Sequence, residues 1–126
     1  MGLDYGTKRV GVAISDGNGT IAFPRTTLFN DGEMMKTLLD VVKEEHIERI
    51  IVGDTRSHGG GSNPVTAEAE KFTEELARQT GLSVSRAFEV FSSIEASRYA
   101  PEGAVKDDAA AAAIILQRFL DMNPSR

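Results

Sequence analysis

Apolar and polar residues alternate at the start of the chain in the pattern of short strands. Leu3–Tyr5 and the Val- and Ile-rich segment Arg9–Ser15 predict two strands joined by a tight turn. The Gly-containing run at 16–19 predicts a second turn, before a third strand at Ile21–Phe23. Strands joined by tight turns pair antiparallel, so this region is predicted to form a three-stranded antiparallel meander.

The pattern then changes to the period of a helix. Four apolar residues fall at the spacing i, i+3, i+4, i+7 of one helix face: Met35, Leu38, Leu39 and Val42. They predict a helix that is capped by Asn30 or Asp31 and runs to about Glu45.

A strand, a polar loop and a second helix follow. Ile50–Gly53 is a short β-branched run closed by glycine and predicts a fourth strand, whereas the polar residues 54–63 predict a loop. Asn63 and Pro64 are suited to be the cap and the first residue of the next helix, which Gly81 ends.

The last third of the chain predicts one more strand and two helices. Ser83–Val90 has the composition of a fifth strand, and a capping box at 92–95 predicts a short helix. Asp107 and Asp108 then precede the helical segment Ala109–Leu120. This segment is apolar on almost every side at first, so we expect it to be buried against the sheet or against a partner subunit.

This order of elements predicts an α/β fold. The antiparallel meander would continue into two parallel strands, and helices would flank the resulting mixed five-stranded sheet. The chain has 126 residues, of which 40% are hydrophobic, enough for a single domain over 1–126.

Composition narrows the class of protein. The chain contains no Cys, which excludes a disulfide framework and a thiolate site and is compatible with a reducing compartment, so we expect a cytoplasmic protein. It has no apolar run long enough to span a bilayer and no signal-peptide pattern at its start. The net charge of -5 argues against indiscriminate binding of polyanions, although a local basic rim can coexist with a negative total.

Three acidic residues lie where an α/β sheet presents side chains to a ligand. Asp4 is in the first strand, Glu89 is at the exit of the fifth, and Asp108 is in the first turn of the last helix. If they converged, they would repel one another unless hard divalent cations such as Mg²⁺ neutralised them. Two such ions about 4 Å apart can activate a water and stabilise the leaving oxygen of a phosphodiester.

Each of these acids also has a purely structural explanation. Asp4 could form a turn with Gly6, Glu89 could be an exposed strand end, and Asp108 could complement the helix dipole. Spacing alone does not decide between these explanations and a shared catalytic site.

The opening segment GLDYGTKRVGVAISD closely resembles the start of the YqgF/RuvX family of Holliday-junction-resolvase-like proteins. That family has the RNase H fold, and its members are also described as pre-16S rRNA nucleases. The resemblance continues over IIVGDTRSHGGGSNPVTAEAEKFTEEL, EVFSSIEA and KDDAAAAAIILQRFLD, and thus covers essentially the whole chain. It implies an RNase H-like nuclease that acts on structured nucleic acid, in pre-16S rRNA 5′-end processing or in Holliday-junction resolution.

The resemblance also implies roles for the three acids. Asp4 corresponds to the catalytic aspartate of the first strand, Glu89 to the glutamate of an Asp-Glu-Arg motif, and Asp108 to the aspartate that opens the last helix. All three would be catalytic metal ligands, with Mg²⁺, or Mn²⁺ in its place, as the cofactor. A two-fold junction would suit a homodimer, although burial on its own sheet explains the apolar last helix equally well.

Four basic residues are candidates for contacts with a nucleic-acid backbone: Lys8, Arg9, Arg56 and His58. The first two flank the first predicted turn, and the other two lie in the Gly-rich loop, where a basic segment can meet phosphates. For each of them the alternative is a solvated surface side chain.

Two positions beside Glu89 depart from the family motif. Phe88 stands where the family has Asp, and Val90 where it has Arg. One alternative is therefore a catalytically impaired module of the same fold that binds nucleic acid or a partner protein. Another is ATP binding, because DYGTKRVG also resembles the first phosphate motif of actin, Hsp70 and the sugar kinases, although those proteins need two such halves.

Overall fold

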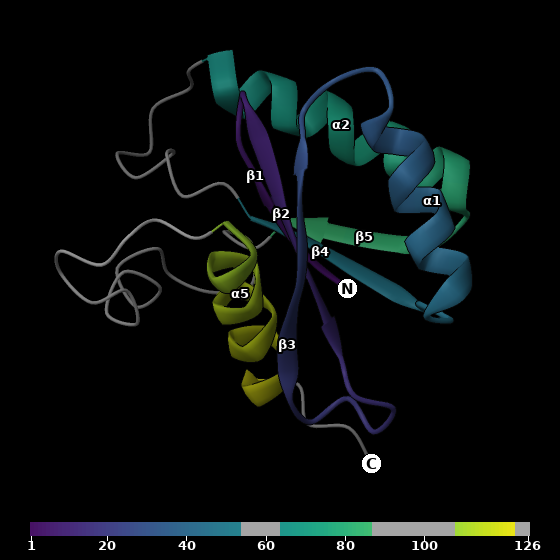
Figure 1. The fold of residues 1–126 in the computed structure, drawn as a ribbon, viewed down its shortest axis with the longest axis vertical. Coiled ribbons are helices and arrows are strands. Elements are labelled where there is room, and N and C mark those ends of the chain that lie inside the picture. Colours follow the sequence, from purple (N-terminus) through teal and green to yellow (C-terminus); the bar gives the residue numbers. More distant parts are fainter. Residues whose placement is uncertain (54–63, 87–107, 123–126) are drawn as a thin grey trace, which may run out of the picture.

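A mixed five-stranded sheet forms the centre of the molecule, with the strand order β3-β2-β1-β4-β5 (Figure 1). The structure is a computed structural model that describes residues 1–53, 64–86 and 108–122. The five strands are β1 (Gly2–Tyr5), β2 (Arg9–Ser15), β3 (Ala22–Phe29), β4 (Arg49–Gly53) and β5 (Ser83–Arg86). β1, β2 and β3 pair antiparallel, whereas β4 and β5 run parallel to β1, which confirms the predicted sheet.

The third strand is longer than the sequence pattern predicted. It was expected over Ile21–Phe23, but β3 extends over Ala22–Phe29. β3 is an edge strand whose residues are all half-buried or exposed, and this gives a weak hydrophobic signal. Pro24 lies within this strand, paired with Ala13 at a register shift, and an edge strand tolerates proline there.

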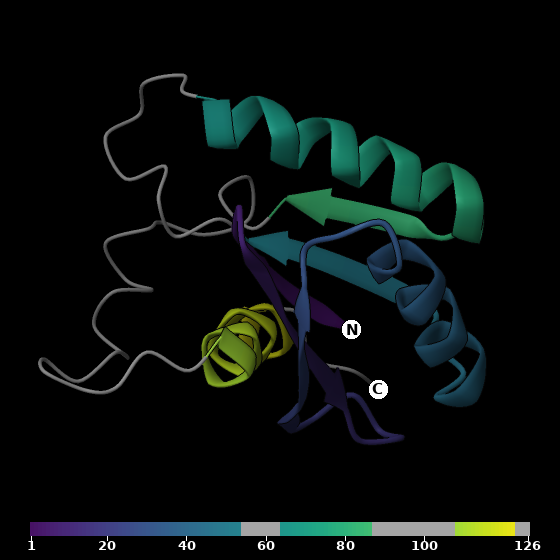
Figure 2. The same cartoon turned by 45° about the horizontal axis from the view of Figure 1, so that its top comes forward.

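In the part of the chain that the structure describes, three helices pack on the two faces of the sheet. α1 (Met34–Glu44) and α2 (Pro64–Thr80) cover one face, and α5 (Asp108–Met122) covers the other (Figure 2). Gly81, with φ +72°, ends α2 as predicted, because the left-handed conformation that follows a helix favours glycine. In the described residues, no helix is long and apolar enough to cross a membrane.

The predicted cap of α1 is wrong. The capping position is Glu33, whose side chain makes no capping hydrogen bond. Asp31 instead accepts a hydrogen bond from the backbone nitrogen of Glu33 at 2.9 Å, within the turn before the helix. The side chain of Asn30 is used elsewhere, because it donates to the backbone oxygen of Gly6 at 2.8 Å.

Each face of the sheet has its own hydrophobic core. The larger core lies under α1 and α2 and includes Leu3, Val10, Val12, Leu38, Ile50, Val52 and Leu76. The smaller one lies under α5 and consists of Ala13, Ile51, Ala112, Ile115, Leu116 and Phe119. The apolar side of α5 is thus buried against its own sheet, the first of the two alternatives that its sequence left open.

Candidate active site

Asp4 lies inside the central strand β1 and not in a turn. Its neighbours across the sheet are Gly11 on β2 and Gly53 on β4. Residues in register point to the same face of a sheet, so Asp4 and both glycines face α5. Asp4 is only 4% exposed, and its two glycine neighbours place no side chains beside it.

Glycines on this face allow α5 to approach the sheet closely. A side chain at Gly2 would come within 2.7 Å of the Cβ atom of Leu116, and one at Gly53 would collide with Ile115. At Gly11 even a methyl group would overlap the backbone oxygen of Asp108. The start of α5 therefore rests directly on the backbone of β2.

This contact brings Asp108 next to Asp4. Asp108 is the first residue of α5 and lies over Gly11, the cross-strand partner of Asp4. Directly opposite residues of an antiparallel pair have Cα atoms about 4.5–5.5 Å apart. Two buried carboxylic acids from opposite ends of the chain thus occupy neighbouring positions on one face of the sheet.

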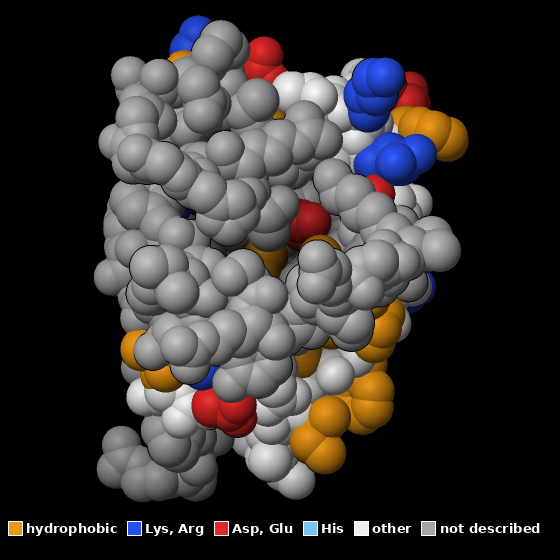
Figure 3. Space-filling view, turned by 90° about the vertical axis from the view of Figure 1, so that its left-hand side faces the viewer, with side chains coloured by type: hydrophobic (Ala, Val, Ile, Leu, Met, Phe, Trp, Pro, Cys, Tyr) orange, Lys and Arg blue, Asp and Glu red, His pale blue; other side chains and the backbone are white. Residues whose placement is uncertain are grey.

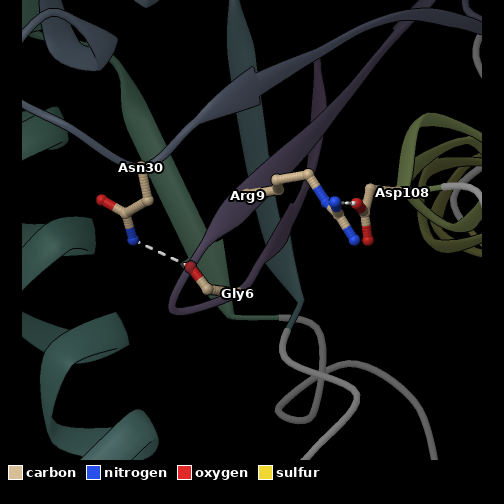
Figure 4. A network of polar contacts seen from close by, with 4 residues as sticks. All are labelled: Gly6, Arg9, Asn30 and Asp108. Atoms are coloured by element: carbon tan, nitrogen blue, oxygen red, sulfur yellow. Dashed lines mark hydrogen bonds and ion pairs between the residues drawn. The ribbon is translucent and has the colours of Figure 1, made fainter.

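Arg9 neutralises part of this acidic charge. Its Nε atom donates a hydrogen bond to Oδ2 of Asp108 at 3.0 Å (Figure 4). The side chain of Asp108 is 10% exposed, whereas that of Arg9 is 54% exposed. The guanidinium group therefore contacts the buried carboxylate and also faces the solvent, so a ligand can reach the guanidinium group.

Asn30 holds the turn that carries Arg9. Its side chain donates a hydrogen bond to the backbone oxygen of Gly6, in the turn between β1 and β2 (Figure 4). Its backbone nitrogen donates to the backbone oxygen of Lys8 at 2.9 Å. The end of β3 is thereby tied to the start of β2. The sequence pattern predicted Asn30 or Asp31 as a helix cap, and it gave no signal for this role because the predicted third strand ended at Phe23.

The two acids lie toward the end of the sheet at which β1, β4 and β5 finish. In open α/β sheets, ligands bind at the carboxyl ends of the parallel strands. Figure 3 shows this side of the molecule, where an acidic side chain is visible deep in the surface beside hydrophobic ones. Lys8 is exposed in the turn at the same end.

The other predicted site residues lie outside the described residues: Glu89, Arg56 and His58, together with Phe88 and Val90. Within the described ranges, no group of three His, Cys, Asp or Glu residues could hold a metal ion. The described part of the site therefore offers two carboxylates, Asp4 and Asp108. The catalytic roles of the predicted residues stay predictions.

A family model described as "RuvX: Holliday junction resolvase" matches residues 1–122. The chain belongs to the RuvX family. Three relatives that match nearly the full length of the chain carry the name "Putative pre-16S rRNA nuclease". The protein from Nitratidesulfovibrio vulgaris is 40% identical, and the match covers 100% of this chain and 95% of the relative. The protein from Oleidesulfovibrio alaskensis is 34% identical, and the match covers 100% of this chain and 94% of the relative. The protein from Bordetella petrii is 33% identical, and the match covers 98% of this chain and 95% of the relative.

Membership of the RuvX family confirms three of the predictions. The resemblance of the opening segment is real and extends over nearly the whole chain. The mixed five-stranded sheet with helices on both faces is the RNase H-like fold that the resemblance implied. The prediction of an enzyme of the nuclease class is confirmed by the family description and the names of the relatives.

Proposed function

We propose that this RuvX-family protein is a Mg²⁺-dependent nuclease that hydrolyses phosphodiester bonds in structured nucleic acid in the cytoplasm. The observation that carries the proposal is the approach of Asp108 to Gly11, which brings it beside Asp4. Two carboxylates held close together repel each other, and a catalytic role gives a reason to retain both.

The donor set fits a hard divalent cation. Mg²⁺ is usually held by one or two carboxylates together with waters and substrate phosphates, and not by a cage made of protein alone. Asp4 and Asp108 would supply two ligands, with Glu89 as the third. The chemistry that Mg²⁺ would contribute when bound is activation of a water and stabilisation of the leaving oxygen.

The residues of the chain would position these groups and the substrate. Asp4 is fixed by the backbone pairing of the central strand on both sides, and Asp108 by the packing of α5 on β2. Arg9 restrains the Asp108 carboxylate and presents its exposed guanidinium group to a phosphate. Lys8, Arg56 and His58 would add contacts to the backbone of the nucleic acid.

Pre-16S rRNA is the substrate that the names of the relatives favour. A four-way DNA junction is the second candidate, because the family description names a Holliday junction resolvase. A catalytically impaired binding module is the alternative to both, and it is favoured by Phe88 and Val90, which replace two charged residues of the family motif.

A nuclease assay separates these proposals. The full chain is incubated with a pre-16S rRNA leader or with a four-way junction, in buffers that contain Mg²⁺, Mn²⁺ or EDTA. We expect cleavage of one substrate with either metal and none with EDTA. Binding without cleavage in every metal would support the impaired module and contradict a nuclease.

Asp4→Asn is the matching variant for this assay. It removes a proposed ligand, so we expect cleavage to fall by more than the roughly 10–100-fold that loss of an outer-shell partner costs. Its melting temperature should hold or rise, because one of two adjacent carboxylates is neutralised. Asp40→Asn makes the same chemical change at an exposed position on α1 and should cleave normally. Wild-type turnover by Asp4→Asn would contradict the assignment of Asp4.

A further inference from the structure

Phe29 is the most exposed large hydrophobic residue in the described part of the chain. It is 73% exposed, compared with 50% for Ile21, 49% for Met122 and 48% for Phe23. It belongs to neither hydrophobic core. Packing within the described fold therefore does not account for an aromatic residue at this position.

Phe29 lies beside Arg9 at the same end of the sheet as the two acids. It is the last residue of β3, and its cross-strand partner on β2 is Arg9. The bond from the nitrogen of Asn30 to the oxygen of Lys8 makes those two residues a hydrogen-bonded pair. The next pair, Phe29 and Arg9, is then a non-hydrogen-bonded one, in which side chains stand closest together.

The shared register also fixes the face on which Phe29 lies. Arg9 reaches Asp108 on α5, so its side chain is on the α5 face, and its cross-strand partner Phe29 is on that face too. The Asp108 carboxylate, the Arg9 side chain and the Phe29 side chain therefore lie on one face of the sheet, at the same end. Figure 3 shows exposed hydrophobic side chains next to basic ones on this side of the molecule.

An exposed aromatic ring next to cationic side chains is how proteins commonly bind single-stranded nucleic acid. The cations contact phosphates, and the ring stacks on a base. Bases inside a duplex are covered on both faces by their neighbours, so a protein ring stacks on bases that are unpaired or splayed out.

We propose that Phe29 is a stacking platform for an unpaired base of the nucleic acid whose phosphodiester backbone passes Arg9 to reach Asp4 and Asp108. This inference rests on the proposed nuclease function and narrows its substrate to one with an unpaired base beside the scissile position. A second copy of the chain is a poorer occupant, because Pro24 and Arg25 interrupt the same edge strand, and such residues hinder the addition of another strand.

Fluorescence offers a direct test, because the chain contains no Trp. Phe29→Trp introduces a single indole that retains the ability to stack. Phe23→Trp is the matched control, since Phe23 is on the same strand and 48% exposed but pairs with Ile14 near the opposite end of the sheet. Both variants are made in the Asp4→Asn chain so that cleavage does not interfere, and they are titrated with single-stranded RNA and DNA of one sequence.

We expect the oligonucleotides to quench the fluorescence of Phe29→Trp and to leave that of Phe23→Trp unchanged. Measured by anisotropy, Phe29→Ala should bind the oligonucleotide about tenfold more weakly than the chain with Phe29 does. The chain with Phe29 should bind an oligonucleotide that contains abasic sites more weakly by the same factor. Abasic sites should cost nothing further in Phe29→Ala. The RNA and DNA arms show which nucleic acid supplies the base.

Three results would overturn the inference, and they differ in what else they overturn. Unchanged affinity of Phe29→Ala, with no quenching of Phe29→Trp, would refute the stacking role while binding and cleavage by the wild-type chain still supported the nuclease. No binding of any oligonucleotide or of the assay substrates would refute the proposed function as well. Self-association that Phe29→Ala abolishes, measured by light scattering, would assign Phe29 to an interface between copies.

Discussion

The two faces of the sheet differ although alternate residues of the same strands form them. The face under α1 and α2 carries large apolar side chains such as Leu3 and Val52, which are fully buried. On the other face, the neighbouring positions hold Gly2, Asp4 and Gly53. Large side chains fill the first face, whereas glycines on the second let α5 approach the strands closely. Substitutions on the first face should therefore affect mainly stability, and substitutions on the second should also affect cleavage.

The largest expected effect on stability is on the α1 and α2 face. Leu38→Ala removes a fully buried side chain from the larger core, and we expect the free energy of unfolding to fall by about 2–5 kcal/mol. Cleavage per folded molecule should not change, because Leu38 is on the face away from the acids. Urea unfolding and a nuclease assay below the melting temperature measure the two properties. A loss of turnover in folded protein would show that the faces are not independent.

Gly11→Ala should have the next largest effect on stability and, unlike Leu38→Ala, should also reduce cleavage by the folded protein. The added methyl group would overlap the backbone of Asp108, so the start of α5 has to move. We expect this overpacking to lower the free energy of unfolding by about 1–3 kcal/mol. Cleavage should fall by more than the fraction of unfolded protein explains.

Gly17→Ala is the control for this variant. It adds the same methyl group in the turn between β2 and β3, where no atom lies within 4 Å. Its stability and activity should match the wild type. Normal cleavage by Gly11→Ala would contradict the conclusion that the contact between α5 and β2 positions Asp108.

Arg9→Gln should change stability less than either variant and change substrate binding more. The Arg9 side chain is 54% exposed, so its ion pair with Asp108 is screened by solvent and should contribute below about 1 kcal/mol. If Arg9 also contacts a phosphate, the salt dependence of binding should become shallower by about one contact. Anisotropy at several salt concentrations measures this slope, and an unchanged slope would restrict Arg9 to its contact with Asp108.

Asp16→Asn should have the smallest effect on stability and none on cleavage. Asp16 lies in a turn and on neither face of the sheet. Hydrogen bonds from the backbone nitrogens of Thr20 and Ile21 lower the pKa of Asp16, which sits in the turn between β2 and β3. A lowered pKa means that the ionised form stabilises the fold at pH values above the usual Asp pKa of about 3.9, and that this contribution is lost as the pH falls through the folded-state pKa.

The melting temperature of Asp16→Asn should therefore be slightly below that of the wild type at pH 7, and the difference should shrink in acid. Cleavage at pH 7 should not change, because the turn is remote from Asp4 and Asp108. A difference in melting temperature that stays constant from pH 7 to pH 3 would show that the charge of Asp16 does not contribute.

Local patterns in the sequence predicted the parts of the fold that depend on residues near one another in the chain. Alternation and turn residues identified β1 and β2, and Gly81 marked the end of α2. Where the local signal was weak or ambiguous, the prediction was wrong: β3 is an exposed edge strand, and the polar pair Asn30 and Asp31 fits a turn as well as a cap.

The sequence by itself determined the family, the mixed sheet and the two carboxylates Asp4 and Asp108 as candidates. Only the tertiary structure decided that these two acids are neighbours, because their proximity depends on the register of β1 with β2 and on how closely α5 approaches Gly11. The structure also distinguished Arg9 from its neighbour Lys8, although both were predicted to contact a nucleic-acid backbone: only Arg9 is bonded to Asp108. Side chains of successive residues alternate between the two faces of a strand, so the register decides which residue meets Asp108. Pairing across a sheet and packing of a distant helix join residues far apart in the chain, and no local period in the sequence encodes such a distance.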